Sequence, residues 1–130
     1  MVIKVVEREY SDDELYSMFR PYVTEWFKRR FKTFTPPQRM AIPLVKNGLN
    51  VLISSPTGTG KTLAVFLGII DNLYKYYEER GELPEGVYVV YVSPLRALNN
   101  DMYKNLLIPI KEINEIAREM GYELPEIRVA

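Results

Sequence analysis

The sequence predicts an α/β fold, in which a parallel sheet of about three strands is flanked by helices. A short run centred on apolar residues, 50–54, is followed by a glycine-rich turn and a long amphipathic stretch, which is the pattern of a strand, a loop and a helix. A second run, 87–92, is apolar on both alternating faces, as in a parallel strand that helices cover on each side. A third run starts at 127. Strands that alternate with helices favour a β-α-β-α-β order with right-handed crossovers.

Two helices are expected before this domain. Ser11 and Glu14 have the spacing of a capping box, in which each side chain bonds to the backbone of the other, and this box opens the first helix. A second helical stretch is expected at about 22–31. We expect both to be surface helices, and we assign residues 1–34 to an N-terminal helical extension.

A third helix is expected to open the domain itself, which we assign to residues 35–130. Thr35 is followed by Pro36, a residue favoured in the first turn of a helix. Gln38 stands three residues after Thr35, where the second member of a capping box belongs. Apolar residues at helical spacing continue this helix to near Gly48.

The remaining elements follow the glycine-rich turn. The next helix carries its apolar residues on one stripe: Leu63, Phe66, Leu67, Ile70, Leu73, Tyr74 and Tyr77. A polar loop at 80–86 leads to the strand at 87–92, and a further helix is expected from about 97 to 120, bent at Pro109. Because a typical sheet has about 5–6 strands, we expect the remainder of a longer protein, or another chain, to complete this sheet.

The composition excludes several classes of chemistry. The sequence has no Cys and no His, which rules out disulfides, thiol nucleophiles, Cys/His zinc sites and Ser-His-Asp triads. Its 17 basic and 17 acidic residues balance, and 47% apolar residues indicate a packed globular core. The longest apolar run covers only 63–70, far below the ~20 residues that span a bilayer. We therefore expect a cytoplasmic protein with no membrane segment and no leader peptide.

The glycine-rich turn predicts a phosphate-binding loop. It reads Ser55-Pro56-Thr57-Gly58-Thr59-Gly60-Lys61-Thr62. Gly58 and Gly60 allow successive N–H groups to point inward, and the following helix adds the positive end of its dipole. We assign the catalytic roles to Lys61, which would reach the β and γ phosphates, and to Thr62, whose hydroxyl would coordinate Mg²⁺. The alternative is an ordinary glycine-rich turn with an exposed lysine.

The loop itself and one segment upstream of it resemble motifs of superfamily 2 helicases. The strict phosphate-loop pattern has glycine at the position of Ser55. A loop with a small residue in place of this glycine resembles motif I of these helicases. Upstream, residues 34–43 read Phe-Thr-Pro-Pro-Gln-Arg-Met-Ala-Ile-Pro and resemble the Q motif. The resemblance implies that Gln38 reads the adenine edge and so selects ATP over GTP.

A third segment follows the strand at 87–92. Residues 93–101 read Ser-Pro-Leu-Arg-Ala-Leu-Asn-Asn-Asp and look like motif Ia, which in the family holds the phosphate backbone of one nucleic-acid strand. The resemblance assigns this contact to a short set of residues: Pro94, Leu95, Arg96 and Ala97. The three motifs stand in the family's order, which is more specific than the phosphate loop alone.

Among these helicases the sequence most resembles the large helicase-related (Lhr) family of archaea and bacteria, at 35–38, 93–99 and 105–109. This implies that residues 35–130 are an incomplete RecA-like ATP-binding lobe, with ATP and Mg²⁺ as ligands and single-stranded DNA or RNA as partner. The sequence contains no Asp-Glu box, no Ser-Ala-Thr motif and no arginine-finger motif. We therefore expect the chain alone to hydrolyse ATP poorly or not at all, and to act with the remainder of the helicase.

Several alternatives stay open. Gln38 can serve only to cap the helix at Thr35, and Arg96 can be a solvated residue at a helix start. The basic run 28–32 is either a helix end whose cations the dipole favours or a nucleic-acid patch. For the whole protein, the alternatives are a non-helicase P-loop nucleotide-binding protein and an inactive remnant of a disrupted helicase gene.

Overall fold

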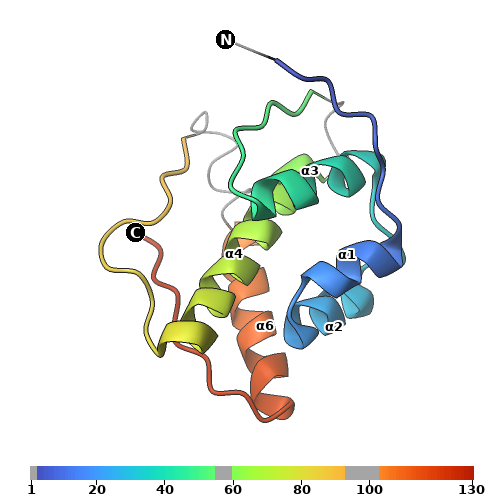
Figure 1. Ribbon diagram of the computed structural model, residues 1–130. Helices are drawn as coiled ribbons and strands as arrows, with labels where there is room; N and C mark the ends of the chain where they lie inside the picture. Colours follow the sequence, from blue (N-terminus) through green and yellow to red (C-terminus); the bar gives the residue numbers. More distant parts are fainter. Residues whose placement is uncertain (1–2, 55–59, 93–102) are drawn as a thin grey trace.

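The computed structural model describes residues 3–54, 60–92 and 103–130. Its elements are the α-helices α1 (Asp12–Met18), α2 (Pro21–Arg30), α3 (Pro36–Lys46) and α4 (Lys61–Arg80), the π-helical turn η1 (Tyr103–Leu107) and the α-helix α6 (Ile108–Glu119) (Figure 1). In the view of Figure 1 the helices gather together, while the stretches 81–92 and 120–130 run along one side of α4. None of the described helices is long and apolar enough to cross a membrane.

Both predicted capping boxes are present. The Ser11 hydroxyl accepts from the backbone N–H of Glu14 over 3.2 Å, and the Glu14 carboxylate accepts from the backbone N–H of Ser11 over 3.1 Å. Thr35 and Gln38 make the same reciprocal pair at the start of α3. These boxes satisfy N–H groups that a helix start leaves unpaired, so the beginnings of α1 and α3 are fixed by local sequence.

One hydrophobic core joins the helices, because α2 packs against α6 and α3 packs against α4. Fully buried side chains come from several elements: Leu15, Tyr22, Val23, Phe27, Ile42, Leu67, Ile70, Tyr74 and Ile113. The expected stripe of α4 is confirmed from Leu63 to Tyr74, whereas Tyr77 is only partly buried. Helices α1 and α2 contribute one face to this core and present the other to solvent. The domain boundary between residues 34 and 35 stays a prediction.

The three predicted strands are not confirmed. In the described residues no strand is assigned, including at 51–54, 87–92 and 127–130. The expected burial is also missing, since Leu52 is 94% exposed and Val92 is 86% exposed. A strand is held by ladder partners on its edges and by packing on its faces, and short apolar runs acquire neither from their own sequence. The sheet therefore remains an expectation from pattern.

The last helix differs from its expected form. The sequence predicts one helix from about 97 to 120 with a bend at Pro109, of which 97–102 lie outside the described residues. The described part begins with the π-helical η1 and passes directly into α6. The change of helix type falls just before Pro109, which has no N–H to donate to the preceding helical turn.

Candidate nucleotide-binding site

The start of α4 carries the described part of the predicted phosphate loop. Gly60 is the N-cap residue and has left-handed backbone angles, φ 77° and ψ 21°. Its carbonyl accepts from the backbone N–H of Ala64 over 3.0 Å, which is the first hydrogen bond of the helix. Gly60 has no side chain to cap the first-turn N–H groups, and the first turn holds no acidic residue. This end of α4 therefore presents the positive end of a helix dipole, which favours an anion.

Gln38 and Gly60 bring two of the predicted motifs into contact. The Gln38 side chain is almost fully buried, and its Nε2 donates to the Gly60 carbonyl over 3.2 Å. A Cβ atom added to Gly60 would lie 2.3 Å from this Nε2, closer than any real contact. Glycine is thus required at position 60 both by its left-handed φ and by the approach of Gln38.

The capping alternative for Gln38 is borne out by the same geometry. The Gln38 amide oxygen accepts from the backbone N–H of Thr35 over 2.9 Å, so the side chain does cap α3. A primary amide has two hydrogens and two lone pairs, so the bonds to Thr35 and Gly60 use half of its capacity. The cap and a contact to adenine are therefore compatible, and the adenine contact stays a prediction.

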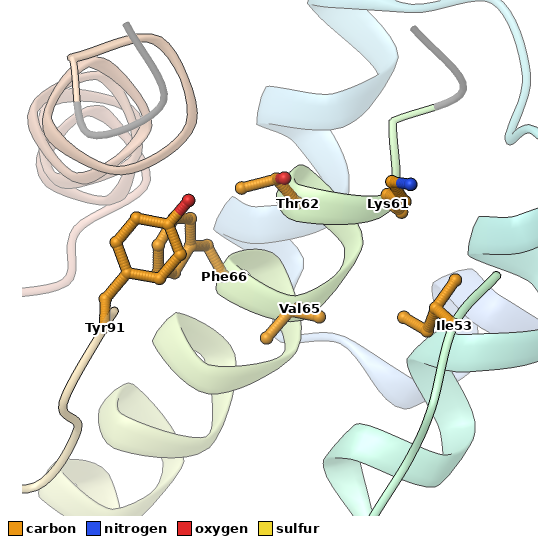
Figure 2. Close-up of a pocket in the computed structure, with 6 residues that line it drawn as sticks. All are labelled: Ile53, Lys61, Thr62, Val65, Phe66 and Tyr91. Carbon is orange, nitrogen blue, oxygen red and sulfur yellow. The ribbon is translucent and has the colours of Figure 1, made fainter. Parts of the chain in front are cut away.

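A pocket of about 200 Å³ lies along the first turns of α4 (Figure 2). It is lined by Ile53, Lys61, Thr62, Val65, Phe66 and Tyr91. Figure 2 shows Ile53 on one side of α4 and Tyr91 on the other, with the Tyr91 ring against Phe66. These two rings meet edge to face with centroids 5.0 Å apart. The sequence analysis identified Lys61 and Thr62 but missed the apolar walls of the pocket. The sequence signal for them was that Tyr91 lies near the end of the apolar run 87–92, next to the motif Ia segment.

The donors at this site fit a nucleoside triphosphate with its Mg²⁺. Lys61 supplies a cation and Thr62 a hydroxyl oxygen, a hard ligand of the kind that Mg²⁺ takes together with phosphate oxygens. The other predicted loop residues, 55–59, lie outside the described residues, and so do the motif Ia residues, 94–97. The structure thus brings four of the predicted site residues together where α3 and α4 begin: Gln38, Gly60, Lys61 and Thr62.

The sequence analysis also missed a buried ion pair between the last residue of α3 and the middle of α4. Lys46, the last residue of α3, forms an ion pair with Asp71 of α4, and both side chains are buried. Lys46 Nζ also donates to the Asn72 side-chain oxygen over 3.0 Å. Burial lowers the pKa of the Lys46 ammonium, while the Asp71 carboxylate acts in the opposite direction. The sequence did contain one indication of this ion pair, because Asp71 is a charged residue within the apolar stripe of α4.

The two arginines of the basic run at the end of α2 are paired with acidic residues. Arg29 contacts Glu25 at 3.1 Å and Glu119 at 3.4 Å, and Arg30 contacts Glu112 at 2.7 Å. The pair with Glu25 lies within α2, whereas the pairs with Glu119 and Glu112 link α2 to α6 at the surface. The structure therefore favours a structural role for both arginines over a nucleic-acid patch.

Comparison with known proteins places the chain in a family. Residues 35–126 match the family model of the DEAD/DEAH box helicase. The chain is 56% identical over 120 residues to "ATP-dependent helicase Lhr-Core" of Saccharolobus solfataricus. The aligned segment covers 92% of the chain and 13% of that protein. It is also 56% identical over 129 residues to "ATP-dependent helicase Lhr-Core protein 2" of Thermococcus barophilus. This aligned segment covers 99% of the chain and 15% of that protein.

More distant relatives carry similar names. The "Lhr helicase/uracil glycosylase" of Escherichia coli is 35% identical over 121 residues, which are 88% of the chain and 8% of that protein. No solved structure matches the chain. The chain spans only about 13% to 15% of the length of the Lhr-Core relatives above. Because the family model matches most of the chain, including the helices that carry Gln38 and Lys61, the chain belongs to the DEAD/DEAH box helicase family.

Proposed function

We propose that this chain is the ATP-binding N-terminal part of an Lhr-type, ATP-dependent nucleic-acid helicase. The observation that carries the proposal is the hydrogen bond from Gln38 to Gly60, which joins the Q-motif helix to the helix of the phosphate loop. An ordinary glycine-rich turn, the alternative to a phosphate loop, does not require a hydrogen bond to the helix that carries Gln38. The Lhr-Core relatives are named ATP-dependent helicases, and the family match favours this function over a non-helicase P-loop protein.

In the proposed site each residue has a separate task. Gln38 contacts the adenine edge, and Lys61 compensates the charge of the β and γ phosphates. The amides of the loop 55–60 surround the phosphates, and Thr62 offers its hydroxyl to Mg²⁺. The bound Mg²⁺ supplies further charge compensation on the phosphates. The chain alone is proposed to bind ATP and to hydrolyse it poorly.

The fold of the family implies a RecA-like α/β domain for this chain. We propose that 50–54, 87–92 and 127–130 are three parallel strands of that domain, completed by further residues of the helicase or by another chain. The support is the apolar pattern of the three runs and, for 87–92, its exposure, since Val87, Val90 and Val92 are each more than three-quarters exposed in the described chain. A large exposed apolar surface of this kind calls for a covering partner.

Residues 94–97 are proposed to hold the backbone of a single nucleic-acid strand, either DNA or RNA. Their support is the motif Ia resemblance and the position directly after the run 87–92. In open α/β sheets, ligand sites gather at the carboxyl ends of strands. A cytoplasmic location is part of the same proposal.

The experiment that tests this function is the ATPase rate of the full-length gene product, measured with and without single-stranded DNA or RNA. We expect ATP hydrolysis that rises when nucleic acid is added. A Lys111→Ala variant, altered at an exposed position of α6, serves as a control and should match the wild type. An ATPase rate that does not change when nucleic acid is added would favour the non-helicase alternative. The absence of ATP hydrolysis would favour the inactive remnant.

A further inference from the structure

Asp71 joins three helices at one buried point. Its side chain is fully buried in the middle of α4. One carboxylate oxygen, Oδ1, accepts from the backbone N–H of Arg20 over 2.7 Å. The other, Oδ2, forms the ion pair with Lys46 of α3. Arg20 is the N-cap residue of α2, and its backbone N–H, which the N3 side chain would satisfy in a capping box, is satisfied from α4 by Asp71.

Neighbouring residues of α4 hold the same turn between α1 and α2. Lys75 lies one turn after Asp71, and its Nζ donates to the carbonyl of Met18, the last residue of α1. The anion therefore faces the N-terminus of α2 and the cation faces the C-terminus of α1. Each charge has the sign that the adjacent helix dipole favours. The helices that precede residue 35 are thus anchored on the helix that begins at Lys61.

Helix α3 is attached to α4 at both of its ends. Near its start, Gln38 donates to Gly60, and at its last residue Lys46 pairs with Asp71. Between these points Val45 approaches Gly68 so closely that a Cβ there would lie 3.0 Å from Val45 Cγ1. The two helices therefore advance in the same sense with little room between them. A shift at the Lys46 end changes the position of α3 along α4, and with it the position of the Gln38 amide.

We propose that Asp71 is a positioning residue of the nucleotide site, which anchors α2 and α3 on α4 and thereby sets Gln38 against Gly60. This inference rests on the proposed function, because it assigns a role toward bound ATP. Asp71 itself does not touch the nucleotide in this proposal. It acts through α3, the helix that carries Gln38.

The chemistry of a buried ion pair supports positioning over stability. Removing two charges from water is costly, and apolar residues of similar volume often stabilise a core equally well or better. What a buried pair adds is a defined geometry, because any displacement leaves one charge buried without its partner. Lys46 and Asp71 therefore fix one arrangement of α3 on α4, and the same arrangement places the Gln38 amide at the loop.

The test is steady-state kinetics of the full-length gene product with ATP and with GTP. The Asp71→Asn variant keeps an acceptor for the Arg20 N–H and removes the charge that pairs with Lys46. We expect KM for ATP to rise about fivefold or more, a typical size for coupling between separate sites, while KM for GTP changes little. The rate at saturating ATP should stay near the wild-type value. KM and the ATP-to-GTP ratio do not depend on the fraction of folded enzyme, so lost stability alone cannot produce this result.

Two further variants complete the test. Glu78→Gln, on the same helix, disturbs the contacts of Glu78 to Arg20 and Tyr22 but touches no residue of α3, and it should keep the wild-type KM ratio. If Asp71→Asn does not fold, the double variant Lys46→Met/Asp71→Asn removes both charges and should show the same rise in KM. An active wild type whose KM ratio is unchanged in these Asp71 variants overturns the inference alone. An inactive wild type overturns the proposed function and the inference together.

Discussion

The side-chain amide of Gln38 donates a hydrogen bond to the carbonyl of Gly60, 22 residues further along the chain. The same amide caps α3 through its oxygen, which accepts from Thr35. One buried side chain therefore sets both the start of α3 and the distance from α3 to the first turn of α4. Changes at either end of this bond are expected to alter nucleotide binding.

Replacing Gln38 by Ala is expected to narrow the difference between ATP and GTP affinity. An amide can accept from the N6 amino group of adenine and donate to its N7, whereas the corresponding edge of guanine presents two acceptors, O6 and N7. Nucleotide affinities of the full-length protein provide the measurement. The control is Thr35→Ala, which weakens the cap but leaves the amide in place and should preserve the difference. An unchanged difference in Gln38→Ala, with α3 still folded, would return Gln38 to a purely capping role.

Replacing Gly60 by Ala is expected to destabilise the chain more than replacing Gly48 by Ala. Both glycines have positive φ, so each alanine carries a strain of about 1 kcal/mol. Only at Gly60 would the new Cβ displace the Gln38 amide, since nothing lies within 4 Å of a Cβ at Gly48. Loss of the hydrogen bond between Gln38 and Gly60 should lower the free energy of unfolding by about a further 1 kcal/mol. Urea denaturation of both variants provides the measurement. This extra loss should vanish when Gly60→Ala is made in a Gln38→Ala background; if it persists there, Gln38 is not its cause.

Replacing Lys61 by Ala is expected to lower the ATPase rate of the full-length protein about 100-fold or more. Backbone amides alone do not neutralise a triphosphate, and Lys61 supplies the compensating charge at the start of α4. Initial rates at saturating ATP provide the measurement, with Lys111→Ala as the matched control. A variant that turns over at the wild-type rate contradicts the assignment of Lys61.

Replacing Arg96 by Ala is expected to weaken single-strand binding about equally for all sequences. A contact to phosphate releases one counterion, so the slope of log affinity against log salt should fall by ~0.7. The measurement is a salt titration with two unrelated oligonucleotides. Arg29→Ala is the control, because the Arg29 guanidinium already pairs with Glu25. Equal slopes and affinities in Arg96→Ala and wild type would refute the phosphate contact, and a loss confined to one oligonucleotide would indicate base reading.

Replacing Tyr74 by Phe is expected to leave stability at neutral pH equal or up to about 1 kcal/mol higher. Within the described residues the buried Tyr74 hydroxyl has no hydrogen-bond partner, and the nearby Asn114 amide donates to the Pro125 carbonyl. An apolar replacement of the same shape removes a polar group that is buried without a partner. Urea denaturation at pH 7 provides the measurement. The control is Tyr22→Phe, which loses a bond to Glu78 and should be destabilised.

The same tyrosine makes stability sensitive to alkaline pH. Burial raises the pKa of Tyr74 from 10 to about 12. Because the folded pKa is the higher one, the folded chain keeps a proton that the unfolded chain loses, and stability is fully present below pH 10 and declines toward pH 12. Denaturation between pH 9 and 12 should therefore show a shallower decline in Tyr74→Phe. Identical declines in variant and wild type would contradict this reason.

The elements that the sequence predicted well are those fixed by local chemistry. The capping boxes at Ser11 and Thr35 and the apolar stripe of α4 need only neighbouring residues to form. The runs 51–54 and 87–92 have the composition of strands, but strand pairing depends on distant partners, and in the described residues none is assigned. A strand pattern therefore predicts a tendency, whereas a helix cap predicts a position.

The candidate site divides in the same way. The motif order placed Gln38 and Lys61 in one site, and the structure brings their helix starts together. The pairing of Lys46 with Asp71 could not be read from spacing, because it depends on how α3 lies along α4. A charged residue within an apolar stripe indicates that a partner exists, but it does not say which residue that partner is.

Two helices that advance in the same sense also have parallel dipoles. The positive ends of α3 and α4 meet where Gln38 contacts Gly60, and like ends placed together repel each other. This repulsion opposes the close packing of the two helices. In the proposed site a phosphate group at the start of α4 would be attracted by both ends at once and would offset their mutual repulsion. In the proposed site the nucleotide would thus complete the electrostatic balance of the helix pair that receives it.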